Sequence, residues 1–324
     1  MRTFRQKILK FLLLILVLNA SPACSRESVR VGVLAYGTLD WELATIQAQK
    51  LDEKYGFVLQ KWPLSNPQAG KIALQSGSVD LIISDWVWVS AQRARGFDYT
   101  FSPYSTASGS LIVAADSTIH SIEDLPGKRV GIAGGELDKN WLLLIALARK
   151  SKNIDLDAQV EKIFGAAPLL NQELLRGELD ALLTYWHYAA RLEALGYREI
   201  LNGDSIISGL GIDLALPTLG YVFREGWARA HRELLRNFLK ATLEAKNLLC
   251  ESDSDWEAIG HLTESDDPKV RDRFRQKYCG GRIKQFDDRH KATSAKVFGL
   301  LHEVAGARLA GPSPVLAAGT FWND

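Results

Sequence analysis

The 324-residue sequence lacks a strong charge of either sign, because its formal net charge is only +1 at pH 7. Bulk electrostatics therefore gives no reason to expect nucleic-acid binding. The sequence also lacks a G-x-S-x-G elbow, an H-E-x-x-H helix and a P-loop, which are common marks of hydrolase, metalloprotease and nucleotide sites. Its three cysteines are widely spaced, so no Cys and His cluster suggests zinc. These absences argue against nucleic-acid binding and against the enzyme classes that such motifs mark.

Long apolar runs are missing as well, with one exception near the N-terminus. Residues 11–18 read FLLLILVL and follow four basic residues, with small residues after them. A short apolar run of this kind behind basic residues is typical of a secretory signal peptide, predicted here over residues 1–23. The run is far shorter than the roughly 20 residues that a membrane span needs. We therefore expect a periplasmic or otherwise extracytoplasmic protein.

Cys24 follows the predicted signal peptide, and two readings of this position stay open. Ser21 and Ala23 are the small residues that ordinary signal peptidase accepts. Alternatively, Ser21-Pro22-Ala23-Cys24 is a lipoprotein site in which a leucine is missing from the usual pattern. Cys24 would then carry a lipid that tethers the protein to a membrane face without spanning it.

The other two cysteines, Cys250 and Cys279, form an even pair. In an oxidising compartment such a pair predicts a disulfide. Closing this segment of the chain would stabilise the fold by roughly 3–4 kcal/mol in the chain-entropy model. Two buried free thiols are the alternative.

Strand and helix patterns alternate in the first third of the chain. Such alternation with short links predicts an α/β fold with a mainly parallel sheet covered on both faces. The predicted strands are 29–36, 57–64 and 79–84, and the predicted helices are 41–56, 66–79 and 86–95.

The same alternation restarts after an extended stretch at 104–116, and a second extended stretch follows at 211–223. The chain is then mostly helical, over 227–250, 267–279 and 291–306. We therefore predict two α/β lobes, the first made of 27–107 plus 216–324 and the second of 108–215. Two strands cross between the lobes, near 104–114 and 210–222. Lobes joined in this way can open and close a cleft by a hinge motion.

Three stretches carry a resemblance to a known family: SIEDLPGKRVGIAGG at 121–135, the helix and "G-x-L-D-A" strand within 173–197, and TLGYVFREGWARAHRELLRNFLKATLEA at 218–245. Their order and spacing resemble the solute-binding proteins of ABC importers in the nitrate/taurine/sulfonate (NMT1/THI5-like) group. The resemblance implies a type II periplasmic-binding fold and a small-molecule solute. It also implies that ABC permease and ATPase subunits are the partners and that the protein is a monomer. The resemblance implies no cofactor and no catalytic activity.

Acids and tryptophans gather where the predicted strands end and helices begin. Ligands bind at the carboxyl ends of strands in open parallel sheets, so these positions predict the walls of the cleft. Thr106 and Asp213 lie at the two crossings. The predicted ligand-binding residues are Asp40, Trp41, Asp85, Trp86, Thr106, Glu136, Asp138, Trp186 and Asp213.

Each of these residues also has a plain structural reading. Asp40 and Asp85 are suitable helix caps, and Trp41 and Trp186 are suitable core residues. Trp86 and Trp88 cannot share one helical face, because a spacing of two turns the side chain by about 200°. We predict that Trp86 faces the cleft and that Trp88 packs behind it.

The charge of the solute has three possible readings. Anions are the usual solutes of the resembled family and bind at helix N-termini, but carboxylates stand at those entries here. Acids beside aromatic rings favour an organic cation, which is the preferred prediction. The five acids Asp40, Asp85, Glu136, Asp138 and Asp213 are instead a possible cage for a hard metal ion.

Two other classes of function remain as alternatives. The fold of the resembled family also occurs in enzymes of thiamine-pyrimidine and menaquinone biosynthesis. The thiamine-pyrimidine enzymes resemble a cysteine-rich protein, whereas this chain has three cysteines. The predicted export signal argues against a cytosolic enzyme of either kind. An exported sensor or accessory subunit that binds a partner protein is the other alternative.

Overall fold

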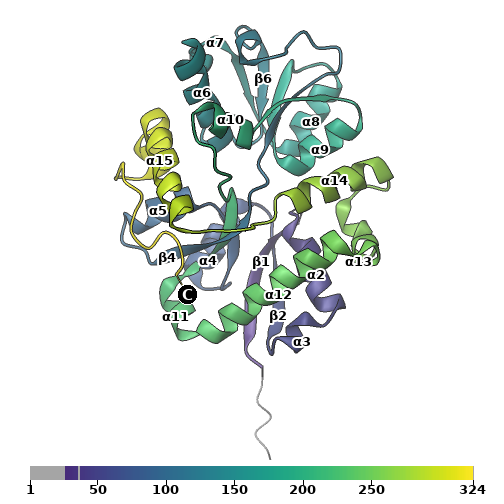
Figure 1. Cartoon of the computed structure of the whole chain (residues 1–324), viewed down its shortest axis with the longest axis vertical. Coiled ribbons are helices and arrows are strands. Elements are labelled where there is room, and N and C mark those ends of the chain that lie inside the picture. Colours follow the sequence, from purple (N-terminus) through teal and green to yellow (C-terminus); the bar gives the residue numbers. More distant parts are fainter. Residues whose placement is uncertain (1–25, 36, 324) are drawn as a thin grey trace, which may run out of the picture.

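The computed structural model describes residues 26–35 and 37–323. The predicted signal peptide and Cys24 lie outside the described residues. The chain forms two lobes, each a sheet flanked by helices, and Figure 1 shows one lobe above the other. The prediction of a two-lobed α/β fold is confirmed. Within the described residues, no helix has both the length and the apolar character that crossing a membrane requires.

The lower lobe in Figure 1 contains two groups of strands that lie edge to edge. Strand β1 (Ser28–Leu34) pairs in parallel with β2 (Val58–Leu64). The second group has the order β3 (Ile82–Ser84), β10 (Leu219–Arg224) and β4 (Tyr99–Ser105). The N–H of Gly32 in β1 donates to the carbonyl of Leu81, just before β3, at 2.9 Å. This bond joins the two groups into one layer.

The upper lobe has one five-stranded sheet. Its order is β7 (Glu161–Phe164), β6 (Arg129–Ile132), β8 (Ala181–Thr184), β5 (Ser110–Val113) and β9 (Arg198–Asn202). Strand β6 is parallel to β7 and β8, whereas β5 is antiparallel to β8 and β9.

Each sheet thus contains one reversed strand, and it is the strand that follows a crossing. Strand β5 follows the first crossing, and β10 follows the second. The single extended stretch predicted at 104–116 is two strands, because β4 ends at Ser105 and β5 begins at Ser110. Gly109 separates them at a point where a Cβ atom would lie 2.4 Å from the carbonyl oxygen of Thr184. The exact boundaries of the two lobes stay a prediction.

The helices follow the predicted pattern with small differences at their ends. The predicted helix 41–56 is divided at Lys50, which has a left-handed φ of 53°. The helices are α2 (Leu39–Ala48), α3 (Leu51–Lys54), α4 (Pro67–Ser76), α5 (Trp86–Arg93), α6 (Lys139–Lys152), α7 (Leu156–Gln159), α8 (Ala167–Leu175), α9 (Trp186–Ala194), α10 (Gly203–Gly209), α11 (Glu225–Ala230), α12 (Arg232–Glu251), α13 (Asp253–Ala258), α14 (Pro268–Gly280), α15 (Asp288–Ala305) and α16 (Ala307–Ala310).

Polar side chains cap the helices that begin where the lobes meet. Asn66 accepts the N–H of Ala69 at the start of α4, and Asp85 accepts the N–H of Trp88 at the start of α5. Asp138 accepts the N–H of Trp141 at the start of α6. Each cap satisfies a donor that has no partner inside its helix. The two aspartates therefore begin their helices, as local sequence predicts, before any role in binding.

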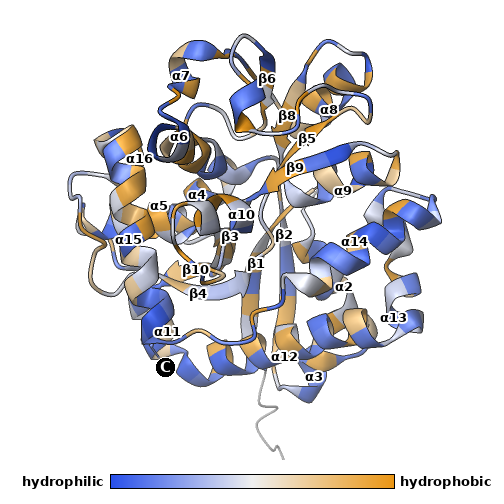
Figure 2. Ribbon diagram, turned by 45° about the horizontal axis from the view of Figure 1, so that its top comes forward, coloured by the Kyte–Doolittle hydropathy of each residue, from blue (hydrophilic) through white to orange (hydrophobic). Residues whose placement is uncertain are grey.

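The C-terminal helices hold the two lobes together. Helix α14 packs against α9 of the upper lobe and α15 packs against α6, as Figure 1 also shows. Figure 2 shows hydrophobic residues along β5 and β8, and outer helices that carry hydrophilic residues between their apolar ones. One buried cluster contains Leu111 and Leu144 of the upper lobe together with Phe298 of α15. The lobes are therefore packed against each other in this arrangement.

Candidate functional site

The two lobes meet in an ion pair between the beginnings of α5 and α6. The Lys139 ammonium lies 2.9 Å from Oδ2 of Asp85. The other carboxylate oxygen of Asp85 accepts the N–H of Trp88 at 2.8 Å. One carboxylate therefore caps a helix of the first lobe and binds a cation of the second. We call Asp85, Lys139, Lys71 and Asp138 the polar junction.

The polar junction holds opposite charges in a largely dry place. Burial alone would raise the pKa of Asp85, but Lys139, the Trp88 N–H and Lys71 outweigh it and leave this pKa below its ordinary value. Burial would likewise lower the pKa of Lys139, but Asp85 keeps it above its ordinary value. Both groups are therefore ionised at neutral pH. The Lys139 side chain keeps 37% of its exposure and that of Asp85 keeps 11%, so the pair still has access to water.

The remaining two members lie beside this pair and balance each other in charge. Burial lowers the pKa of Lys71, and Asp85 partly offsets this effect. Burial raises the pKa of Asp138, although the Trp141 N–H and Lys139 act in the opposite direction. The junction as a whole carries two acids and two bases.

The two tryptophans of α5 differ in burial and in their neighbours. Trp86 is buried, and its indole N–H donates to the carbonyl of Pro217 in the second crossing at 2.9 Å. Trp88 is only partly buried, and the Lys71 ammonium lies 5.1 Å from its ring centroid. The backbone of the second crossing holds the Trp86 indole in this arrangement, and the contact of Trp86 with a solute stays a prediction. Trp88 is the ring that lies beside a charge of the polar junction.

Trp41 and Trp186 meet each other across the lobes. Their ring centroids are 6.1 Å apart with an interplanar angle of 89°, a favourable edge-to-face arrangement. They are only 4% and 8% exposed. Three rings of α13 and α14 complete this group. We call Trp41, Trp186, Trp256, Phe274 and Tyr278 the aromatic junction.

The rings of the aromatic junction are packed against one another. The Trp41 centroid lies 5.5 Å from that of Trp256, 5.7 Å from that of Phe274 and 5.6 Å from that of Tyr278. The Trp41 indole N–H donates to the carbonyl of Leu262. In this arrangement neighbouring rings cover Trp41 and Trp186, and their role as ligand-binding residues stays a prediction.

A disulfide supports the aromatic junction. Cys250 at the end of α12 is bonded to Cys279 in α14, next to Tyr278. The bond fixes α14 to the first lobe while α14 packs on α9 of the second lobe. His187, the neighbour of Trp186, is also held here with both ring nitrogens buried and without a hydrogen-bond partner. Burial, with the charge of Arg191, lowers the pKa of His187 to about 3.

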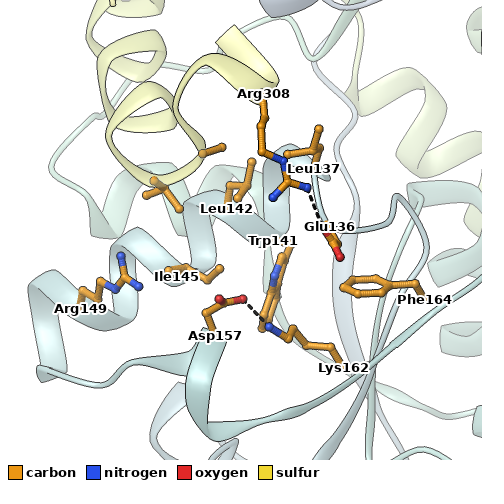
Figure 3. A pocket seen from close by; sticks show the side chains of 12 residues that line it. Glu136, Leu137, Trp141, Leu142, Ile145, Arg149, Asp157, Lys162, Phe164 and Arg308 are labelled. Carbon is orange, nitrogen blue, oxygen red and sulfur yellow. Dashed lines mark hydrogen bonds and ion pairs between the residues drawn. The ribbon is translucent and has the colours of Figure 1, made fainter.

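Glu136 lies at the edge of the lobe contact and not in the polar junction. Its carboxylate pairs with Arg308 of α16 at 2.6 Å, and both side chains are exposed. Figure 3 shows this pair on the rim of a pocket of about 270 Å³ between α6 and the end of α15. Lys162 and Asp157 form a second ion pair on the opposite wall.

Three other predicted residues lie apart from the polar junction. Asp40 pairs with Lys61 of β2 at 2.8 Å. Asp213 is exposed and accepts a hydrogen bond from the Ser208 hydroxyl. It lies near the C-terminal end of α6, where Lys150 donates to the carbonyl of Leu210. Asp85 instead meets the N-terminal end of α6. Thr106 contributes its backbone, with its N–H donating to the carbonyl of Gly281.

The proposed metal cage is not formed. Within residues 26–35 and 37–323, no group of three or more His, Cys, Asp or Glu side chains is placed to hold a metal ion. Asp40, Asp85 and Glu136 each face a different basic residue. The five acids share the ends of strands and helices in sequence, but each is directed to its own partner.

Sequence reasoning missed the two lysines of the polar junction. It weighed the acids at the helix entries and left out the bases beside them. Lys139 directly follows Asp138, and Lys71 lies in the helix that follows β2. The available signal was a base near the beginning of each helix, Lys139 as the first residue of α6 and Lys71 as the fifth of α4, which would have predicted a balanced junction in place of an acidic one.

Comparison with known proteins agrees with this architecture. A family model described as "NMT1/THI5 like" matches residues 59–253, which is more than half of the chain. The alkanesulfonate-binding protein SsuA from Xanthomonas axonopodis pv. citri, solved with bound MOPS, is 19% identical with a TM-score of 0.68 over 93% of this chain and 99% of that one. The periplasmic aliphatic sulphonate-binding protein SsuA from Escherichia coli is 18% identical with a TM-score of 0.73 over 92% of each chain.

One similar curated protein is the L-cystine-binding protein TcyJ of Escherichia coli (strain K12). It is 26% identical over 139 residues, which are 42% of this chain. The match spans 46% of the length of that relative, so it covers about half of it. At these identities the solved structures show the fold alone.

Proposed function

The chain belongs to the NMT1/THI5-like family, and from this premise we propose that it is the extracytoplasmic solute-binding receptor of an ABC importer. It would capture a small solute between its lobes and deliver it to permease and ATPase subunits. Its role would be capture and not catalysis. The observation that carries the proposal is the Lys139–Asp85 ion pair, which joins helix beginnings of opposite lobes.

The ion pair suits a closing mechanism. A receptor closes on its solute when the closed state offers contacts that the open state lacks. Asp85 and Lys139 can face the same solute only when α5 and α6 approach each other, as they do here. When the lobes part, each charge is released to water and becomes available to an incoming polar group.

The charges of the polar junction support a solute that carries both signs. A cation alone would bind Asp85 but leave Lys139 without its partner, and an anion alone would do the reverse. Leaving one member of this partly exposed pair without a partner costs free energy, although less than in a fully buried pair. An amino group beside Asp85 and an acidic group beside Lys139 would satisfy both. We therefore propose a zwitterionic solute, in place of the purely cationic one that the acids in the sequence favour.

The names of similar proteins are compatible with this range of chemistry. Sulfonates and L-cystine are the molecules named for the relatives described above. The identity of the solute of this chain, its lipid anchor at Cys24 and its monomeric state are parts of the proposal that rest on sequence patterns and on the family.

A panel of solutes tests the proposal. The melting temperature of the mature protein would be measured with glycine, β-alanine and taurine, with an alkanesulfonate that lacks an amine, and with an alkylamine. A solute that binds the folded state raises the melting temperature by mass action. We expect the zwitterions to give the largest shifts. If only the alkanesulfonate without an amine raises the melting temperature, the proposal of a zwitterionic solute is wrong, but the proposal of a solute-binding receptor stands.

Matched variants connect any binding to the polar junction. Asp85→Asn keeps a good capping residue and removes the charge, and Lys139→Met removes the opposite charge. Each should weaken binding of a zwitterion by about tenfold or more, which corresponds to about 1.4 kcal/mol. Lys240→Met, at an exposed position of α12, is the control and should leave binding unchanged. Equal affinity in all three variants would place the site elsewhere, and turnover of a panel compound would contradict the receptor.

A further inference from the structure

A second cavity lies in the first lobe, away from the polar junction. It has a volume of about 390 Å³ and opens between α12 and the segment 282–284. This size is within the range of small-molecule pockets. Figure 1 shows the segment between α14 and α15 crossing the front of the molecule above α12. None of the four residues of the polar junction lines this cavity.

The inner wall of the cavity is a buried charged network. Glu42 is fully buried and accepts the hydroxyls of Tyr278 at 2.6 Å and Tyr221 at 3.2 Å. The Lys246 ammonium lies 3.2 Å from the same carboxylate and donates to the carbonyl of Tyr104 at 2.6 Å. The acid is therefore fully engaged, and it leaves little acceptor capacity for a ligand.

Donors are in excess around the rest of the cavity. The Tyr104 hydroxyl is buried beside Glu42, and burial and this acid raise its pKa. Lys246, Arg282 and Lys284 line the cavity. Lys246 pairs with Glu42 and Arg282 pairs with Glu251 at 3.0 Å, so Lys284 is the base that the acids beside the cavity leave uncompensated. A ligand that supplies acceptors and negative charge fits such a surface.

The cavity also has an apolar wall. Leu239 and Leu243 of α12 and Ile283 of the outer segment line it. A bare inorganic anion would leave these side chains without a partner. An organic anion would bury its apolar part against them and direct its charge toward the basic residues.

The cavity lies beside the first crossing between the lobes. Its wall includes Pro103 and the Tyr104 ring of β4, just before the crossing. The segment that forms its outer wall is held to the crossing, because the Thr106 N–H donates to the carbonyl of Gly281 and Ser105 bridges to Arg282.

We propose that this cavity is a second binding site, specific for a small organic anion and independent of the interlobe solute. The basic side chains at the opening and the apolar wall together select this class of ligand. The site needs no contribution from the upper lobe.

Calorimetry with benzoate, inorganic phosphate and benzylamine tests this site on the full mature chain. We expect benzoate to bind more tightly than phosphate, and benzylamine not to bind. Lys284→Glu should lower benzoate affinity about tenfold by removing one charged contact. Lys284 is exposed, so this variant should fold normally. The control is Lys240→Glu, which makes the same change at an exposed position of α12 outside the cavity.

A third variant separates this site from the polar junction. Lys139→Met should leave benzoate affinity unchanged while it weakens zwitterion binding. If benzoate binds equally to Lys284→Glu and to the unchanged protein, or does not bind at all, the second site is overturned and the interlobe proposal stands. If benzoate affinity falls only in Lys139→Met, benzoate binds at the polar junction, and the proposal of a second site is wrong. Equal affinity for phosphate would overturn the organic character of the ligand.

Discussion

The polar junction and the aromatic junction join the same two lobes by different physics. At the polar junction one ion pair spans the gap, and Lys139 remains 37% exposed. At the aromatic junction Trp41 and Trp186 are almost completely buried among three further rings. A disulfide adds a covalent tie between α12 and α14 on the aromatic side. On the polar side no disulfide lies among the described residues, but α15 packs against α6 there, and Phe298 shares a buried cluster with Leu144.

This difference indicates which of the two interlobe contacts a bound solute can replace. An ion pair near water contributes little net stability, so a solute with matching charges can replace it at small cost. Buried aromatic side chains contribute through large apolar areas and ring contacts, which a small polar solute cannot replace. We expect the aromatic side to stay packed while the polar side opens, so that the lobes move about the aromatic junction.

Breaking the aromatic junction should have the largest effect. Trp186→Ala removes a buried ring that touches Trp41 and Phe274 across the lobes. Replacing a buried tryptophan by alanine costs about 3–5 kcal/mol, measured here as the free energy of unfolding in urea. Trp62→Ala is the control, since Trp62 is 49% exposed and should cost less than about 1 kcal/mol. Similar losses in the two variants would contradict the structural role of this junction.

Removing the covalent tie should have the next largest effect. The double variant Cys250→Ser/Cys279→Ser opens a loop with a sequence separation of 29 residues. It should lower the free energy of unfolding by roughly 3–4 kcal/mol in the chain-entropy model. Reducing agent should destabilise the unchanged protein by a similar amount and leave the double variant unaffected. A destabilisation of the double variant by reductant would mean that the agent acts elsewhere.

Acid should weaken the aromatic junction through His187. Its pKa of about 3 in the folded protein compares with about 6.5 when unfolded. The unfolded state therefore binds more protons between these values, and stability falls as the pH falls through this window. The expected loss between pH 7 and pH 5 is about 2 kcal/mol. His187→Gln should abolish this pH dependence, whereas His261→Gln, at an exposed position, should retain it; equal profiles would contradict the assignment.

Local chemistry explains what the sequence could predict about the fold. Asp85 and Asp138 begin helices because a carboxylate satisfies free N–H groups one turn away. The alternation of strands and helices follows from apolar periodicity. Strand β9 and helix α10 were not predicted. The antiparallel placement of β5 and β10 was missed as well, because it depends on which strands they meet after crossing between lobes.

The site was less predictable because its partners are distant in the sequence. Asp85 and Lys139 belong to different lobes, and no local pattern links them. The direction of the Trp86 ring depends on a carbonyl of the second crossing, Pro217. Periodicity correctly separated Trp86 from Trp88 onto different faces, but it could not indicate which face meets the other lobe.

Removing the polar contact should have the smallest effect on stability. In the absence of solute, Asp85→Asn keeps a capping residue and should cost about 1 kcal/mol, as expected for a partly exposed ion pair. The Asp85 pKa is lowered in the folded protein. The contribution of this charge is therefore present above the ordinary carboxyl pKa of about 4 and is lost as the pH falls below it. The difference between variant and unchanged protein should shrink in that range.

The same variant distinguishes a replaceable contact from a structural one. With the ion pair gone, the packing of α15 against α6 remains, so we expect a partial shift toward an open form, which X-ray scattering should show as a modest rise in the radius of gyration. Asp116→Asn, at an exposed position of the upper lobe, should leave both stability and scattering unchanged. If Asp85→Asn lowered the free energy of unfolding as much as Trp186→Ala does, the proposed difference between the two junctions would be wrong. The polar side would then be part of the structural support of the closed form, and a solute could not displace it at small cost.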